Sequence, residues 1–191
     1  MARALTLLII RHAEKPDDAW PGPGLTTSGE ADKESLVIRG WQRAGAWAAL
    51  FGAGLGGADY PKPQAIYAAT PGSDDRLNHG PSRRPYETIV PLAARLGVNP
   101  NTQIAKGEED KLAATLLALD GVALVAWEHE AIIGDLLPRL PVNHGKPPTQ
   151  WPSDRFDVVL RLDRAEGAEA FAYRPLYPQL LSGDSSAPLD G

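Results

Sequence analysis

A run of apolar residues that ends abruptly in charged side chains limits the folds open to this chain. Residues 5–10 read Leu-Thr-Leu-Leu-Ile-Ile and are followed by Arg11, His12, Ala13 and Glu14. Near-continuous apolar runs of this length are typical of buried parallel strands. In open α/β sheets, ligands bind just beyond the carboxyl ends of such strands. We therefore expect Arg11 and His12 to face a ligand.

A second apolar run, residues 121–127, leads directly into Glu128, His129 and Glu130. It also predicts a buried strand with a histidine just past its carboxyl end. Because the carboxyl ends of parallel strands meet at one edge of a sheet, we expect His12 and His129 to lie close together.

Strand patterns and helix patterns alternate along most of the chain. This alternation predicts a three-layer α/β/α sandwich with a mostly parallel sheet. Two late segments that pair back on each other add an antiparallel edge hairpin. We expect one domain over residues 1–181 and a flexible tail over residues 182–191. The predicted strands are 4–11, 64–69, 121–127, 156–163 and 170–173, and the predicted helices are 36–51, 85–96, 107–119 and 132–137.

The composition excludes several classes of protein. A formal net charge of −5 argues against broad electrostatic binding to nucleic acid or to an anionic membrane. The chain has no cysteine, which excludes disulfides, thiolate metal sites and a cysteine nucleophile. Its longest apolar runs are shorter than the ~20 residues that span a bilayer. We expect a cytoplasmic protein that binds neither nucleic acid nor membranes, and its oligomeric state stays open.

Two arginines complete a pocket suited to a phosphoryl group. Arg84 precedes the start of a predicted helix, where backbone N–H groups and the helix dipole favour an anion. Arg11 adjoins His12, and the guanidinium fork binds phosphoryl oxygens in bidentate fashion. A histidine in such a pocket can attack phosphorus and form a covalent phosphohistidine.

These residues resemble the signatures of a known family, the histidine phosphatase superfamily, also called phosphoglycerate mutase-like. Residues 11–14, Arg-His-Ala-Glu, resemble its Arg-His-Gly/Ala-Glu signature. Residues 36–44 resemble its Leu-Thr-x-x-Gly-x-x-Gln-Ala helix, and residues 84–88, Arg-Pro-Tyr-Glu-Thr, resemble its Arg-Ala-x-Gln-Thr. Residues 122–129 resemble the strand that delivers its second catalytic histidine. Four features in the right order over residues 4–140 make the match specific.

The resemblance implies a role for each residue of the pocket. His12 is the phosphorylated nucleophile, Arg11 and Arg84 bind the phosphoryl oxygens, and His129 stabilises the transition state. Arg83 is a rival to Arg84, although the spacing to Thr88 favours Arg84. The resemblance implies neither a metal nor a cofactor, and the histidines lack the spacing of a zinc motif.

The carboxyl group that protonates the leaving oxygen stays open. Glu130 resembles the acid of the His-Asp pair in the acid phosphatase branch of the family. Glu108 and Glu109 lie where the mutase branch often places its acid. We favour Glu130. Further candidates that shape the pocket or contact the substrate are Glu14, Lys15, Thr70 and Arg83.

The predicted function is hydrolysis of a phosphomonoester through a phosphohistidine at His12. The substrate is a small phosphorylated molecule, and a phosphoprotein is a further possibility. One alternative is a phosphomutase with the same chemistry. The other is a non-catalytic module that binds a phosphorylated ligand. Substrate identity is not encoded in any motif of the chain.

Overall fold

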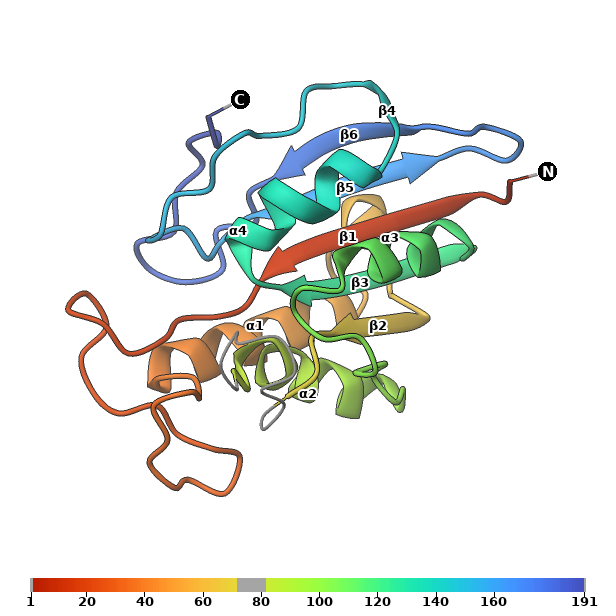
Figure 1. Cartoon of the computed structure of the whole chain (residues 1–191). Helices are drawn as coiled ribbons and strands as arrows, with labels where there is room; N and C mark the ends of the chain where they lie inside the picture. The colour runs from red at the N-terminus through yellow and green to blue at the C-terminus, as the bar shows by residue number, and fades with distance from the viewer. Residues whose placement is uncertain (1, 72–81, 191) are drawn as a thin grey trace.

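The computed structural model describes residues 2–71 and 82–190. Strand β1 lies in the interior of the central sheet, with a strand on either side (Figure 1). The described strands form one six-stranded sheet in the order β2-β3-β1-β5-β6-β4. Most of the loop that we place at residues 71–83 lies outside the described residues. The strands are β1 (Leu5–Arg11), β2 (Ala65–Ala68), β3 (Gly121–Trp127), β4 (Val142–His144), β5 (Val159–Arg164) and β6 (Phe171–Leu176).

The strand pairing combines parallel and antiparallel partners. β3 pairs in parallel with both β1 and β2, and β4 pairs in parallel with β6. β5 pairs antiparallel with β1 and with β6. The predicted antiparallel hairpin is therefore confirmed, but β5 lies directly beside β1. The outer strand is the short β4, which the Pro-rich sequence around it led us to place in a loop.

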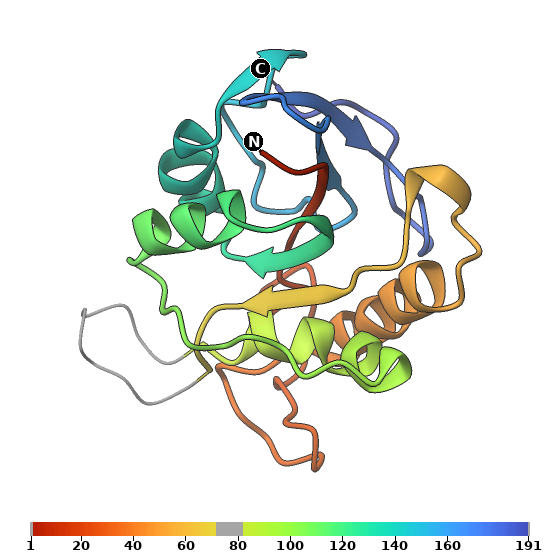
Figure 2. The same cartoon turned by 90° about the vertical axis from the view of Figure 1, so that its right-hand side faces the viewer.

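Helices cover both faces of the sheet, which confirms the three-layer sandwich (Figure 2). Leu8 and Ile10 of β1 pack toward α1 and α2, whereas Leu7 and Ile9 pack toward α3 and the helical segment after β3. This division follows from the two-residue period of a strand, since successive side chains point to opposite faces. The longer helices are α1 (Ile38–Gly52), α2 (Arg84–Leu96) and α3 (Glu109–Leu117).

The segment after β3 winds as one irregular helical stretch. It begins as an α-helical turn, continues with wider π-helical turns and ends in a tight turn that contains Pro138. Stretches of π-helix are rare and are often found at functional sites. Its parts are α4 (His129–Ala131), η3 (Ile132–Leu136) and η4 (Leu137–Arg139), and a separate short turn, η1, covers Gly57–Asp59.

The start of α1 lies very close to the segment that follows β1. A Cβ atom added to Gly40 would lie 2.5 Å from the carbonyl oxygen of Glu14, so a glycine is required there. The N–H of Val37, just before the helix, donates to that same oxygen at 3.2 Å. The glycine of the family-like motif in residues 36–44 thus lets α1 pack directly against the residues that follow β1.

The C-terminal segment 182–190, for which we predict a flexible tail, lies against the body of the domain. Asp184 accepts hydrogen bonds from Arg43 at 2.7 and 3.1 Å. Leu189 is buried, and its N–H donates to the hydroxyl of Tyr177. Within the part of the chain that the structure describes, no helix is long and apolar enough to cross a bilayer.

Candidate active site

His12 lies directly after β1 and is 4% exposed. Its backbone N–H donates to the carbonyl of Trp127 at 2.9 Å, which continues the pairing of β1 with β3. The ring Nδ1 lies 2.8 Å from the carbonyl oxygen of Ala13. Because a carbonyl oxygen only accepts, Nδ1 carries the proton, and Nε2 is left with a lone pair.

The environment of His12 keeps its imidazole neutral. Burial, with a smaller contribution from the neighbouring charge of Arg11, lowers the pKa of His12 from 6.5 to about 3. Arg84 also lowers this pKa, which indicates that its charge lies near the ring. At neutral pH the Nε2 lone pair of His12 is therefore free to act as a nucleophile.

Arg11 is fully buried and uses only part of its guanidinium group within the protein. Its Nη1 donates to three carbonyl oxygens, those of Pro152 (3.1 Å), Ser153 (2.8 Å) and Arg155 (3.1 Å). Its Cζ lies 3.9 Å from the centre of the Phe156 ring. Its Nε and Nη2 atoms are buried and have no hydrogen-bond partner among the described residues. Burial lowers the pKa of Arg11 to about 10, so the group stays charged at neutral pH.

Two adjacent arginines at the start of α2 differ in burial. Arg84 donates to the carbonyl of Lys33 at 2.7 Å, and its side chain is only 16% exposed. Its Nε is buried without a partner in the described part of the chain. The side chain of Arg83 is 53% exposed and pairs with Asp32 at 3.1 Å. Arg84 also lies 3.3 Å from Glu34, but it is the more buried of the two arginines and its charge acts on His12. Arg84 is therefore the better candidate for the second arginine of the site.

The residues that follow Arg84 attach α2 to the segment after β1. The hydroxyl of Thr88 accepts the N–H of Ala13 at 2.8 Å and donates to the carbonyl of Arg84 at 2.7 Å. The buried carboxylate of Glu87 accepts hydrogen bonds from Ser35 and Leu36 at 2.8 and 3.0 Å. Residues 84–88 thus fix the helix start relative to His12.

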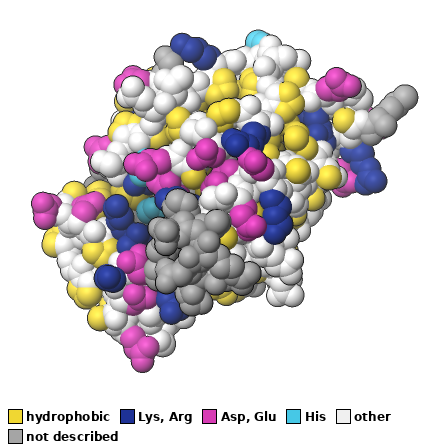
Figure 3. Space-filling model, viewed as in Figure 1, with side chains coloured by type: hydrophobic (Ala, Val, Ile, Leu, Met, Phe, Trp, Pro, Cys, Tyr) yellow, Lys and Arg dark blue, Asp and Glu magenta, His cyan; other side chains and the backbone are white. Residues whose placement is uncertain are grey.

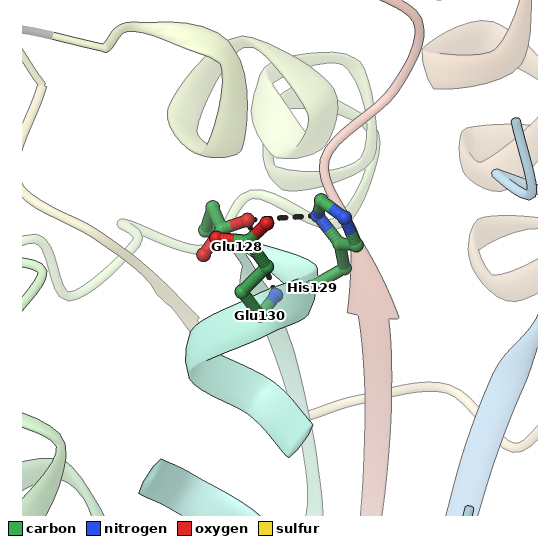
Figure 4. Close-up of side chains that lie close together, drawn as sticks. All are labelled: Glu128, His129 and Glu130. Carbon is green, nitrogen blue, oxygen red and sulfur yellow. Dashed lines mark hydrogen bonds and ion pairs between the residues drawn. The ribbon is translucent and has the colours of Figure 1, made fainter. Parts of the chain in front are cut away.

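His129 is the first residue of α4 and lies beyond the end of β3, beside the end of β1 (Figure 4). Its Nδ1 lies 2.7 Å from Oε1 of Glu128. That carboxylate also accepts the backbone N–H groups of Glu130 and Ala131, and Lys106 lies 3.4 Å away. Although burial opposes it, these hydrogen bonds hold the pKa of Glu128 far below its ordinary value. Glu128 is therefore a permanent carboxylate that fixes the His129 ring.

The three candidate proton donors have different surroundings. Glu109 is buried and accepts hydrogen bonds from the Trp127 indole at 2.8 Å and from the N–H of Gly107 at 3.0 Å. Glu108 accepts the N–H of Ala105 at 2.8 Å and lies 3.7 Å from Lys111. The exposed Glu130 lines a pocket together with His129.

Of the remaining candidates, Glu14 lies under α1. Both Nε and Nη2 of Arg43 donate to its carboxylate, at 2.8–3.1 Å. Arg39 lies 3.3 Å from the same group. The hydroxyl of Thr70 donates to the carbonyl of Thr102 at 2.7 Å. Lys15 is half-buried and makes no hydrogen bond or ion pair with the residues that the structure describes. Glu14 and Thr70 thus have partners within the fold, and Lys15 stays a candidate for substrate contact.

One group of acidic and imidazole ligands lies within reach of a metal ion. One ligand atom each from Glu128, His129 and Glu130 lies within 4.8 Å of the others. Two of these residues already contact each other, and Glu128 also accepts two backbone N–H groups. The face drawn in Figure 3 shows acidic and basic side chains gathered around a histidine.

The sequence analysis missed three features of this site. Glu128 was not singled out, although an acid directly before a strand-end histidine is a usable signal. Phe156 lies under Arg11, and its ring centre lies 6.1 Å from that of His12. The carbonyls of residues 152–155 have no sequence signal, because backbone groups are present at every position.

The fold that carries this site is similar to that of a histidine phosphatase of known structure, as the sequence resemblance predicts. Among solved structures, the chain is similar to the protein histidine phosphatase SixA complexed with tungstate, with 14% identity and a TM-score of 0.54 over 91% of this chain and 97% of that chain. It is also similar to a mycobacterial glucosyl-3-phosphoglycerate phosphatase, with 15% identity and a TM-score of 0.44 over 92% and 98%. No family model matches the chain, and no curated protein sequence matches it significantly.

Proposed function

We propose that this protein is a phosphatase that hydrolyses a phosphomonoester through a phosphohistidine at His12. The observation that carries the proposal is the pair of buried Arg11 nitrogens without a partner, next to a buried neutral histidine. A buried donor left unpaired costs ~1–3 kcal/mol, and more when it is charged, so such donors call for an anionic ligand. The fold shared with SixA, itself a phosphatase, supports the same class of activity.

The proposed reaction has two steps, and Glu130 donates a proton in the first and accepts one in the second. In the first, Nε2 of His12 attacks phosphorus, the P–O bond to the leaving group breaks, and the leaving oxygen takes a proton from Glu130. The phosphorylated ring carries a positive charge, which its hydrogen bond to the Ala13 carbonyl stabilises. In the second, Glu130 takes a proton from water, the water oxygen attacks phosphorus, and the N–P bond breaks to release phosphate.

Arg84 and His129 complete the proposed binding of the phosphoryl oxygens. Arg84 faces His12 from the start of α2, and His129 does so from the start of α4. The Glu128 carboxylate lies 2.7 Å from Nδ1 of His129 and orients the ring, so Nε2 is the atom that meets a phosphoryl oxygen in this proposal. These groups stabilise the oxygens while phosphorus is transferred.

Glu130 is the proposed proton donor because its two rivals are engaged elsewhere. Glu109 is held in the core by the Trp127 indole, and Glu108 is held by the backbone of Ala105. The carboxylate of Glu130 has no hydrogen bond or ion pair within the described part of the chain, and it lines a pocket with His129.

Two conservative substitutions should separate proton donation from the positioning of His129. Glu130→Gln should lower kcat/KM, which reports the first step alone, by about 10²–10⁴-fold for benzyl phosphate. The effect on kcat/KM should be far smaller for p-nitrophenyl phosphate, because its leaving group needs no proton. Glu128→Gln keeps an oxygen for the helix start but removes the charge beside His129. It should lower kcat for both substrates equally, by about 10–100-fold. An equal effect of Glu130→Gln on both substrates would remove Glu130 from the proposed role.

The direct test of the proposed function is to trap the intermediate. A screen of aryl phosphates, sugar phosphates, nucleotides and phosphoamino acids first identifies a substrate by phosphate release. Rapid mixing with that substrate carrying labelled phosphate should then give a protein-bound label that is lost in acid and survives base, as a phosphohistidine does. Phosphate release without such a label would contradict the covalent route. No release from any compound would contradict the phosphatase activity itself.

A further inference from the structure

A pocket of about 310 Å³ opens beside the proposed phosphoryl site. His129 and Glu130 form one wall, and Ile133 and Gly134 of η3 continue it. Residues 149–151 form the opposite wall, where Trp151 supplies the largest side chain. His129 belongs both to the proposed phosphoryl site and to this pocket. The rest of a substrate whose phosphate lies at His12 can therefore extend into the pocket.

Both walls of the pocket are fixed without a ligand. Trp151 is 6% exposed, and its indole N–H donates to the carbonyl of Arg155 at 2.8 Å. The same carbonyl accepts a hydrogen bond from Arg11 at 3.1 Å. On the other side, the Glu128 carboxylate holds the start of α4. A pocket built in advance binds its ligand without an ordering cost.

The chemistry of the lining selects the kind of group that fits. Ile133 and Trp151 offer apolar surface, and Thr149 and Gln150 add neutral polar side chains. None of the described residues that line the pocket is a lysine or an arginine, so the lining offers no guanidinium or ammonium group to pair with a second anion. An apolar cavity of about 150 Å³ is enough for benzene, so this pocket has room for a bicyclic group.

We propose that this pocket binds the leaving group of the substrate, and that this group is uncharged and aromatic. The proposal rests on the proposed function, because it places the phosphate of the same molecule at His12. It favours aryl phosphomonoesters, and it disfavours substrates whose leaving group carries a carboxylate or a second phosphate.

Two glycines provide a matched pair of variants. A Cβ atom added at Gly134 meets no heavy atom within 4 Å, and neither does one added at Gly45 on the exposed face of α1. Both glycines have a negative φ, so a side chain strains neither backbone. Gly134→Leu therefore fills the pocket, and Gly45→Leu makes the same change far from it.

The experiment measures kcat/KM for 2-naphthyl phosphate and for acetyl phosphate, whose leaving group is too small to fill the pocket. In Gly134→Leu we expect the ratio of naphthyl to acetyl turnover to fall at least tenfold, and in Gly45→Leu we expect the wild-type ratio. In the unmodified protein, 6-carboxy-2-naphthyl phosphate should have a kcat/KM at least tenfold below that of 2-naphthyl phosphate. An unchanged ratio in Gly134→Leu, or a preference for the carboxylated compound, would overturn the proposal.

A binding measurement separates this proposal from the proposed function. Binding of 2-naphthyl phosphate is measured by calorimetry with His12→Asn. This variant lacks the nucleophile, so the ester is not hydrolysed during the measurement. Adding Gly134→Leu to that protein should weaken binding at least tenfold. If no phosphate is released from any ester but this loss is seen, the phosphatase function fails and the pocket assignment stands. Equal binding by both proteins would overturn the pocket assignment.

Discussion

Replacing His12 with alanine is expected to lower kcat for every phosphomonoester substrate by at least about a thousandfold. In the proposed reaction His12 forms the bond to phosphorus. Its Nε2 is the ring nitrogen that the hydrogen bond to Ala13 leaves free. Arginines that still bind the phosphate cannot replace that lone pair. The measurement is phosphate release under saturating substrate, together with the loss of the acid-labile label.

A second variant tests whether the loss of activity in His12→Ala comes from a folding defect. His12→Asn places an amide nitrogen near the position of Nδ1 and so can retain the hydrogen bond to the Ala13 carbonyl while removing Nε2. It should lose activity as alanine does while its thermal unfolding midpoint stays near that of the wild type. His144→Ala, on the exposed side of β4, is the control and should keep full activity. Substantial activity in His12→Asn would rule out His12 as the nucleophile.

Arg43→Met is expected to lower the free energy of unfolding by about 3–5 kcal/mol. Arg43 lies between Glu14 at 2.8 Å and Asp184 at 2.7 Å, and all three side chains are at most 3% exposed. Although burial opposes it, hydrogen bonds to Asp184 and Glu14 raise the pKa of Arg43 above its ordinary value. Without that cation, two buried carboxylates face each other, with only Arg39 nearby.

Urea unfolding measures this effect, and an exposed ion pair supplies its control. Arg174 pairs with Asp59 at 2.6 Å, but both side chains are more than 40% exposed. Arg174→Met should therefore cost less than about 1 kcal/mol. The triple variant Arg43→Met, Glu14→Gln, Asp184→Asn should regain much of the loss, since it leaves no buried charge. Equal stability of Arg43→Met and Arg174→Met would show that the buried group contributes nothing special.

The stability loss in Arg43→Met should also depend on pH. In the wild type, burial opposes but the bonds from Arg43 outweigh it, so the pKa of Asp184 lies below its ordinary 3.8. A lowered pKa contributes stability that is present above that ordinary value and is lost as the pH falls through the folded value. The variant lacks this contribution. The difference in unfolding free energy should therefore be largest at pH 7 and should shrink below about pH 4.

The parts of the fold that the sequence predicted are those set by local patterns. The strands at residues 5–11 and 121–127 are apolar throughout, and their ends place His12 and His129 at one edge. The helix of residues 84–96 has a proline in its first turn and ends before Gly97, which adopts a left-handed φ of 66°. Periodicity and these end signals need no knowledge of tertiary contacts.

The parts that the sequence could not predict depend on where a side chain points. Glu14 follows His12 by two residues, yet it turns under α1 to meet Arg43, because an arginine on that helix is within reach. The short strand β4 forms only because β6 offers it an edge. The sequence of residues 142–144 has no strand signal of its own, and pairing with a distant partner decides its structure.

The contacts of Arg11 with the loop after residue 151 have a consequence for how such a protein can change over evolution. All three are made to backbone carbonyls, so they depend on the path of the loop and not on its side chains. Residues 152 and 153 can be exchanged while Arg11 keeps its place beside His12, whereas the Arg155 side chain also pairs with Asp157 at 2.8 Å. An insertion or deletion in the same loop would move the carbonyls and disturb the arginine. Residues 149–151, which line the pocket, lie directly before these carbonyls. Their side chains, and hence the molecules that the pocket accepts, can therefore vary only while the length of the loop stays constant.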